Sequence, residues 1–181
     1  MDSRAVNKLV LIGFMGTGKS SVSRELSEQL GWARMDSDDE IVLREQRTIA
    51  DIFSSDGEQR FRDIESEAIS DILHREEPAV VATGGGAVLR ERNRALMLEK
   101  SFVVALAADA DSIIARVSQD EERPLLQGDA GARVHALLEQ RRGAYDFAHA
   151  TIDTTGMSVK DVARDILQRL HDAFETGKSI E

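Results

Sequence analysis

The segment GFMGTGKS (residues 13–20) fits the pattern G-x-x-x-x-G-K-S, which is typical of a loop that binds phosphate. It follows the short apolar run KLVLIGFM (8–15), as expected for a buried parallel strand. It leads into residues 19–30, where apolar residues recur at helical spacing. Between a strand and a helix, successive backbone N–H groups and the helix N-terminus can surround phosphate oxygens. The segment therefore predicts a nucleoside triphosphate site on an α/β fold.

Two side chains of this loop carry its chemistry. Lys19 is expected to reach the β and γ phosphates, and the Ser20 hydroxyl is expected to bind Mg²⁺. A structural turn rich in glycine is the alternative, and the flanking strand and helix argue against it. The residues predicted to contact the nucleotide here are Gly16, Thr17, Gly18, Lys19, Ser20 and Ser21.

The rest of the chain alternates between short apolar runs and segments with helical periodicity. Further strands are predicted in WARMD (32–36), PAVVAT (78–83) and SFVVALAA (101–108). In FRDIESEAISDIL (61–73) the apolar residues line one helical face, as a helix packed on a core requires. A last helix is expected to begin at the Ser158–Asp161 capping pair. Its predicted apolar stripe is Val159, Val162, Ile166, Leu170 and Phe174. The alternation predicts a doubly wound, mostly parallel sheet.

Composition limits the classes of partner. A chain of 181 residues can bury a core of its own, and we expect a single domain over 1–181. There are 33 acidic and 23 basic residues, and the formal net charge is −10. Duplex nucleic acid and anionic membranes call for a basic surface, so we expect neither as a partner. A small diffusible substrate fits better.

Cysteine and the N-terminal residues give further limits. The sequence has no cysteine, so it offers neither a disulfide nor a thiolate metal site. The start MDSRAVNKLV lacks the pattern of a signal peptide, and the apolar run 9–15 is too short to span a bilayer. We therefore expect a cytoplasmic protein, and nothing in the sequence suggests more than a monomer.

The stretch RMDSDDE (34–40) places four carboxylates within five positions at a predicted strand end. In an open α/β sheet, ligands bind at the carboxyl edge of the strands, which makes Asp36 and Asp38 candidates for metal or substrate binding. The alternative is a helix start, because Ser37 and Glu40 have the spacing of a capping box and acids complement the helix dipole. Both readings stay open from these residues alone.

Three further features suggest a substrate site. Arg62 in GEQRFRDIE lies one residue off the apolar stripe, where its side chain can reach toward a cleft. The glycines of ATGGGAVL (82–89) lie between a strand and a helix, and such backbone can approach a ligand closely. EQRRGAY (139–145) adds an arginine pair. Arginine binds a carboxylate bidentately and aspartate can accept a hydroxyl proton, so the set favours a hydroxylated carboxylate as substrate.

Together these motifs resemble those of the shikimate kinases. The resemblance runs over nearly the whole chain, through LVLIGFMGTGKS, DSD, TIADIFSSDGEQRFRDIE, TGGGAV, ERPLL and R-x-x-x-Y. It implies a three-layer α/β/α fold of the P-loop class, with a five-stranded parallel sheet and a mobile lid at about 117–133. It also implies phosphorylation of the 3-hydroxyl of shikimate by ATP with Mg²⁺, and a shikimate-binding region at about 36–65.

The resemblance also assigns roles to individual residues. Asp38 would hold the shikimate hydroxyl and act as general base or orienter, and Asp36 would join the Mg²⁺ shell through water. Arg62 and Arg141 would grip the shikimate carboxylate, and Glu65 would orient the arginine. The backbone of Gly84, Gly85 and Gly86 would meet the ring hydroxyls.

The lid assignments rest on the same resemblance. Arg123 would close over ATP and neutralise the transferring phosphoryl group, and Arg116 would stack on adenine. Gly143 stands where the family often has proline, and the adjacent Arg142 leaves the choice of Arg141 open. The competing functions are a related kinase, for gluconate or a nucleotide, and a module that binds nucleotide without transferring phosphate.

Overall fold

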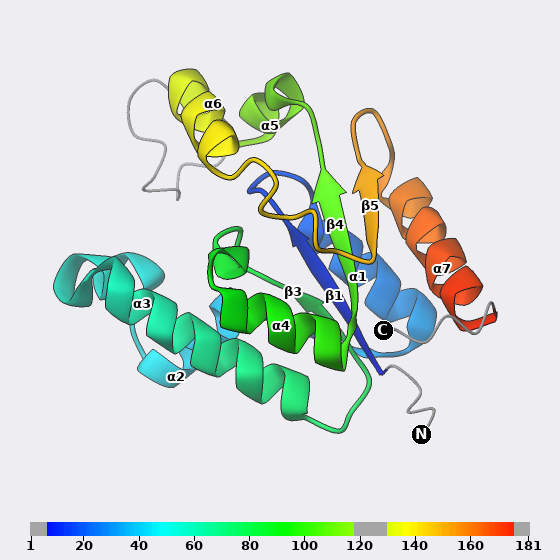
Figure 1. Cartoon of the computed structure of the whole chain (residues 1–181), viewed down its shortest axis with the longest axis horizontal. Helices are drawn as coiled ribbons and strands as arrows, with labels where there is room; N and C mark the ends of the chain where they lie inside the picture. The colour runs from blue at the N-terminus through cyan, green and yellow to red at the C-terminus, as the bar shows by residue number, and fades with distance from the viewer. Residues whose placement is uncertain (1–6, 118–129, 176–181) are drawn as a thin grey trace.

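The computed structural model describes residues 7–117 and 130–175 (Figure 1). In this part of the chain, one sheet contains the strands β1 (Lys8–Gly13), β2 (Ala33–Asp36), β3 (Ala79–Ala82), β4 (Phe102–Ala107) and β5 (Ala150–Asp153). The strand order is β2-β3-β1-β4-β5, and every neighbouring pair is parallel. The predicted α/β fold with a five-stranded parallel sheet is confirmed.

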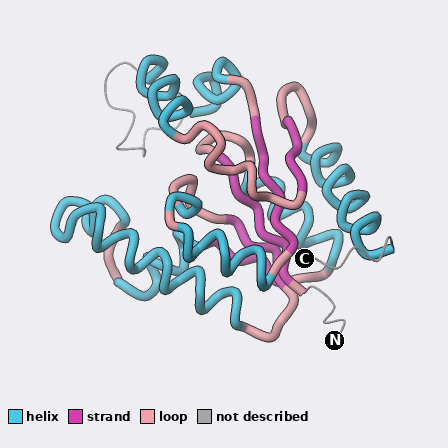
Figure 2. The backbone as a smooth tube through the Cα atoms, viewed as in Figure 1, coloured by secondary structure: helices cyan, strands magenta, loops and turns pink. Residues whose placement is uncertain are grey.

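Helices connect the strands and cover the sheet (Figure 2). They are α1 (Lys19–Leu30), α2 (Ser37–Glu45), α3 (Ile49–His74), the short 3₁₀ helix η1 (Ala87–Leu89), α4 (Glu91–Lys100), α5 (Ala110–Val117), α6 (Ala130–Gln140) and α7 (Val159–Glu175). Most of the predicted lid, including Arg123, lies outside the described residues.

The central strand β1 divides the core into two. Leu9 and Leu11 belong to the cluster formed with α1 and α7, whereas Val10 and Ile12 belong to the cluster formed with α3 and α4. Successive side chains of a strand point to opposite faces, so an uninterrupted apolar strand must be covered on both sides. Figure 1 shows α1 and α7 on one side of the sheet and α3 and α4 on the other, which gives three layers.

The last helix differs from its predicted stripe at one end. Val162 and Ile166 are buried as predicted, but Val159 is 39% exposed. Val159 lies in the first turn of the helix, and periodicity alone does not show which turns are covered. The predicted start is confirmed, because the Asp161 N–H donates to the Ser158 hydroxyl at 3.2 Å. The side chain of Phe174 lies outside the description.

The turn after β1 allows no side chain. Gly13 has a φ of 143°, and it ends the strand two residues earlier than the apolar run predicted. A Cβ atom at Gly13 would lie 2.3 Å from the carbonyl oxygen of Leu106 in the neighbouring strand β4. This close approach brings the phosphate-binding loop against the carboxyl end of β4.

We expect Gly13→Ala to destabilise the fold by about 2–5 kcal/mol, since it adds a steric clash to left-handed backbone strain. The control is Gly31→Ala. Gly31 has a φ of 65°, but a Cβ there would meet no heavy atom within 4 Å. Strain alone should cost about 1–2 kcal/mol. Urea unfolding of both variants measures the difference, and equal losses would contradict the role of the β4 carbonyl.

Candidate active site

The phosphate-binding loop joins β1 to α1 at the carboxyl edge of the sheet. Helix α1 begins after Gly18, which has a φ of 94° and supplies no side-chain cap to the helix. The first N–H groups of an α-helix have no partner within the helix, and the helix dipole is positive there. The start of α1 is therefore suited to receive phosphate oxygens.

Lys19 lies over this loop and is only 9% exposed. Its Nζ donates to the carbonyl oxygens of Gly13 and Phe14, each at 2.8 Å. The ammonium group is thus held at the mouth of the loop. From this position a bound phosphate could replace one of the two carbonyl acceptors.

Arg116 reaches the same loop from α5. Its guanidinium donates to the Gly16 carbonyl at 3.0 Å and to the Thr154 hydroxyl at 3.4 Å. Thr154 follows β5, and its hydroxyl also donates to the Thr17 carbonyl at 3.3 Å. Arg116 therefore lies at the border of the predicted nucleotide site, and its contact with adenine stays a prediction.

The acidic stretch at the end of β2 begins helix α2. Asp36 is the N-cap, and its Oδ1 accepts the Asp38 N–H at 3.0 Å. The predicted capping box of Ser37 and Glu40 is wrong. Ser37 is fully buried, and its hydroxyl accepts the Gly84 N–H at 3.0 Å. Glu40 instead binds Arg44, at 2.8 Å.

The predicted metal ligands are oxygen donors. Ser20 is exposed at the start of α1, and the carboxylate of Asp36 is half-buried at the end of β2. Among residues 7–117 and 130–175, no group of three or more His, Cys, Asp or Glu side chains could hold a metal ion. Mg²⁺ usually keeps several waters and binds one or two protein oxygens together with substrate phosphates. The hydroxyl and the carboxylate fit this chemistry.

Asp38 lies in a cluster of carboxylates beside Gly84. A Cβ atom at Gly84 would lie 2.8 Å from Asp38 Oδ1 and 3.1 Å from Glu65 Oε1. Burial raises the pKa of Asp38 to about 6, and the negative charges of Asp36 and Glu65 add to the rise, while Lys19 opposes it. A carboxyl group with this pKa can accept a proton near neutral pH more readily than an ordinary aspartate.

Arg62 and Glu65 form a pair on α3, beyond a kink at Gly57 where φ is 81°. Arg62 Nη1 lies 2.8 Å from Glu65 Oε2, and Nη2 lies 3.3 Å from Glu58. Burial raises the pKa of Glu65 against the pull of Arg62. Within the described chain, Arg62 Nε and Glu65 Oε1 are buried without a hydrogen-bond partner. The pair therefore retains polar atoms for a ligand or for water.

The structure separates the two arginines that follow α6. Arg141 is 8% exposed and lies with its guanidinium carbon 5.5 Å from the centre of the Phe14 ring. A Cβ atom at Gly85 would lie 3.4 Å from Arg141 Nη1. The Arg142 side chain is 79% exposed and pairs with Glu139. Arg141 therefore lies with the glycines and the phosphate-binding loop, and Arg142 points away.

Gly86, the third glycine of the segment, faces Arg62. A Cβ atom at Gly86 would lie 2.4 Å from Arg62 Nη2, so the guanidinium packs directly on the backbone. The structure thus brings Asp38, Arg62 and Arg141 together around Gly84, Gly85 and Gly86. Sequence reasoning missed Ser37 and Tyr145, which bind Gly84 and Gly85. Tyr145 belongs to the quoted R-x-x-x-Y motif, whereas Ser37 gave no signal beyond its neighbours.

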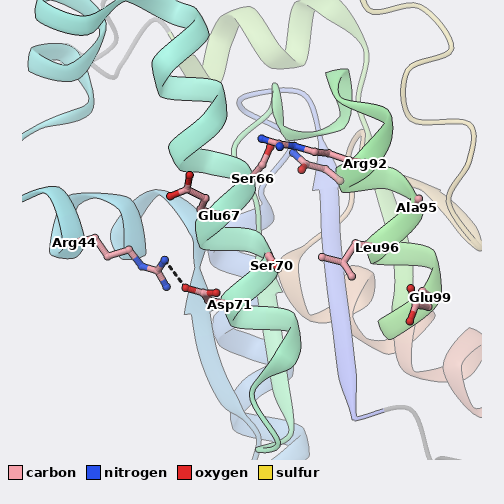
Figure 3. A pocket seen from close by; sticks show the side chains of 10 residues that line it. Arg44, Ser66, Glu67, Ser70, Asp71, Arg92, Ala95, Leu96 and Glu99 are labelled. Atoms are coloured by element: carbon pink, nitrogen blue, oxygen red, sulfur yellow. Dashed lines mark ion pairs between the residues drawn. The ribbon is translucent and has the colours of Figure 1, made fainter.

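A second hollow lies away from these residues, between α3 and α4 (Figure 3). It has a volume of about 720 Å³, and the Arg44–Asp71 ion pair, at 2.7 Å, lies on its rim. Its lining consists of Arg44, Ser66, Glu67, Ser70, Asp71, Arg92, Asn93, Ala95, Leu96 and Glu99. None of them is a predicted site residue, so we call this hollow the α3–α4 groove and treat it separately.

The parallel sheet, the loop before α1 and the acidic and basic residues at the same edge define a phosphotransferase of the P-loop class. The family model described as "Shikimate kinase" matches residues 15–171. The chain therefore belongs to the shikimate kinase family.

Relatives and solved structures agree. The chain is 44% identical over 163 residues to the shikimate kinase of Geobacter metallireducens, covering 90% of each chain. It is 46% identical over 159 residues to that of Geobacter sulfurreducens, covering 87% of each. The structure of the Acinetobacter baumannii shikimate kinase in complex with shikimate matches with a TM-score of 0.87 and 35% identity, over 93% of this chain and 94% of that one.

The raised pKa of Asp38 predicts how the stability of the folded protein changes with pH. This pKa is about 6 in the folded protein against 3.8 for an ordinary aspartate. The folded state therefore binds the proton more tightly, and stability is lost as the pH rises from about 4 through about 6. Asp38→Asn removes this loss, so at pH 7 it should be more stable than wild type by about 1–3 kcal/mol, at 1.36 kcal/mol per pKa unit.

Thermal unfolding of wild type and variant at pH 4 and pH 7 measures this gain, which should nearly vanish at the lower pH. Asp39→Asn is the matched control, because Asp39 is the exposed neighbour in the same helical turn. If the Asp38→Asn protein is no more stable than wild type at pH 7, burial and the neighbouring charges do not destabilise the ionised carboxylate of Asp38.

Proposed function

We propose that this chain transfers the γ-phosphoryl group of ATP to the 3-hydroxyl of shikimate. The observation that supports this best is the convergence of the half-buried Asp38 carboxylate and two arginines on the backbone of Gly84–Gly86, here called the glycine strip. It lies at the edge of the sheet where the phosphate-binding loop lies. Shikimate carries a carboxylate and ring hydroxyls, and each group would meet a matching partner in this arrangement. The family membership gives the same substrate.

The two arginines would orient the acceptor. Arg62 approaches from α3 and Arg141 from the segment after α6, so their guanidinium groups reach the glycine strip from different elements. Guanidinium forks bind carboxylate bidentately, and two of them fix the direction of a ring. Glu65 holds Arg62 through the 2.8 Å ion pair and keeps the fork in place.

Asp38 would hold the acceptor hydroxyl and take its proton as the phosphoryl group is transferred. Lys19 and the N–H groups at the start of α1 would hold the phosphates in line with that hydroxyl. Mg²⁺, when bound with ATP, neutralises charge on the phosphates; the Ser20 hydroxyl and, through water, Asp36 would hold it. For Arg123 and Arg116 we propose the lid and adenine roles that the resemblance implies.

The surroundings of the protein are the next part of the proposal. In residues 7–117 and 130–175, no helix is long and apolar enough to cross a membrane. We propose a monomer that works in the cytoplasm on a small substrate.

Acceptor-dependent release of ADP tests the proposed reaction. Shikimate, gluconate, AMP and no acceptor are compared under the same conditions with ATP and Mg²⁺. We expect turnover with shikimate alone, because its ring holds the carboxylate and the hydroxyls at fixed positions relative to one another. Gluconate carries the same groups on a flexible open chain, and AMP has no carboxylate for the two arginines. Faster turnover with gluconate or AMP would contradict the assignment, and release of ADP without any acceptor would indicate a plain ATPase.

The same assay with Asp38→Asn should show turnover lower by about 10²-fold or more, in line with the loss of a general base. Binding of ATP should stay nearly unchanged. Asp39→Asn again serves as the matched control.

Arg141 and Arg142 provide a test from adjacent positions. Arg141→Ala should raise the KM for shikimate by about 10-fold or more, since a charged hydrogen-bond partner of the substrate is lost. Arg142→Ala should leave it within about twofold, because exposed ion pairs contribute little. Steady-state kinetics at saturating ATP measure both values. A larger rise in the KM for shikimate with Arg142→Ala than with Arg141→Ala would assign the carboxylate contact to Arg142.

A further inference from the structure

Tyr145 is the only tyrosine in the chain, and it connects two parts of the site. It lies between α6 and β5, and its hydroxyl donates to the Gly85 carbonyl at 2.8 Å across 60 positions of sequence. The ring is partly buried and packs against both the α3–α4 side of the core and the cluster beneath α5 and α6. Its position is therefore fixed by packing on two sides.

Arg141 lies beside the same glycine. A Cβ atom at Gly85 would lie 3.4 Å from Arg141 Nη1. The positive charge of Arg141 works against the rise in the pKa of Tyr145 that burial causes. The Tyr145 hydroxyl therefore holds the carbonyl of Gly85 while the Arg141 guanidinium lies against the same residue.

Fixing the Gly85 carbonyl has a consequence for the next residue. In a trans peptide, the carbonyl of Gly85 and the N–H of Gly86 point in opposite directions. Gly86 is buried against Arg62, yet no protein acceptor receives its N–H within the described chain. Buried N–H groups normally have a partner, so this one is available to a ligand.

Gly84 is fixed from the opposite side. Its N–H donates to the buried Ser37 hydroxyl. This amide therefore already has an acceptor within the protein. The glycine strip is therefore held by α2 at one end and by Tyr145 at its centre. Between these anchors, the Gly85–Gly86 peptide has no side chain of its own to set its orientation, and a hydrogen bond must do so.

We propose that Tyr145 is a positioning residue for the acceptor substrate, and this inference rests on the proposed function. By holding the Gly85 carbonyl, Tyr145 turns the Gly86 N–H toward the space beside Arg62. Tyr145 does not touch the reacting atoms; it aligns one backbone donor for the hydroxylated carboxylate that the site receives.

The test is Tyr145→Phe, which keeps the ring and removes only the hydroxyl. We expect the KM for shikimate to rise about three- to tenfold, as the loss of one aligned hydrogen bond predicts. The KM for ATP should stay within about twofold. Calorimetric titration of shikimate without nucleotide should show the same loss of affinity as the KM.

Ser27→Ala is the matched control. It also removes one hydroxyl that donates to a carbonyl, that of Trp32 at 2.7 Å, but at the far end of α1. Thermal unfolding of both variants shows whether they are folded, and the kinetics are compared at a temperature where both are. A folded Tyr145→Phe protein with an unchanged KM for shikimate, or with equal rises for shikimate and ATP, would overturn the inference.

Wild-type turnover separates this inference from the proposed function. If the wild-type protein does not phosphorylate shikimate, the proposed function fails. If it does and Tyr145→Phe behaves like Ser27→Ala, only the role of Tyr145 fails.

Discussion

The close approach of side chains to the backbone of Gly84, Gly85 and Gly86 is the constraint on which the site depends. The Asp38 carboxylate and the Arg62 guanidinium occupy the space that Cβ atoms would need at Gly84 and Gly86, at 2.8 Å and 2.4 Å. Any side chain here would push a proposed catalytic group out of place. The strip also follows β3, which pairs with both β1 and β2. It therefore lies between the phosphate-binding loop and the acidic start of α2.

Charge in this region is balanced locally although the whole chain is acidic. Burial raises the pKa values of Asp36, Asp38 and Glu65, and the nearby cations of Lys19 and Arg62 counteract the rise. Asp36 caps α2 through one oxygen, while the other lies 3.7 Å from a guanidinium nitrogen of Arg34. Helix capping and metal binding are thus compatible for one carboxylate, and acid beside a phosphate site is not a contradiction.

Apolar runs and the loop motif are local signals, and they located four of the five strands. The edge strand β5 has one buried residue, Ile152, and was not located from its residues; the five-stranded sheet followed from the family resemblance. Sequence reasoning failed where tertiary contacts decide. Spacing alone could not show that Asp36 caps α2 while Ser37 turns inward to Gly84. Arg141 and Arg142 are adjacent and chemically identical, so only packing against Phe14 distinguishes them. The link from Tyr145 to Gly85 spans 60 positions, and no periodicity reports such a contact. The family resemblance supplied the residue roles, which stay proposals.

The most direct measurement of the central claim is a crystal structure of this chain with shikimate bound. Our account predicts the shikimate carboxylate between Arg62 and Arg141, the ring on the glycine strip, and one hydroxyl within hydrogen-bond distance of Asp38. Shikimate bound in the α3–α4 groove, or turned so that its carboxylate faces Asp38, would contradict the account.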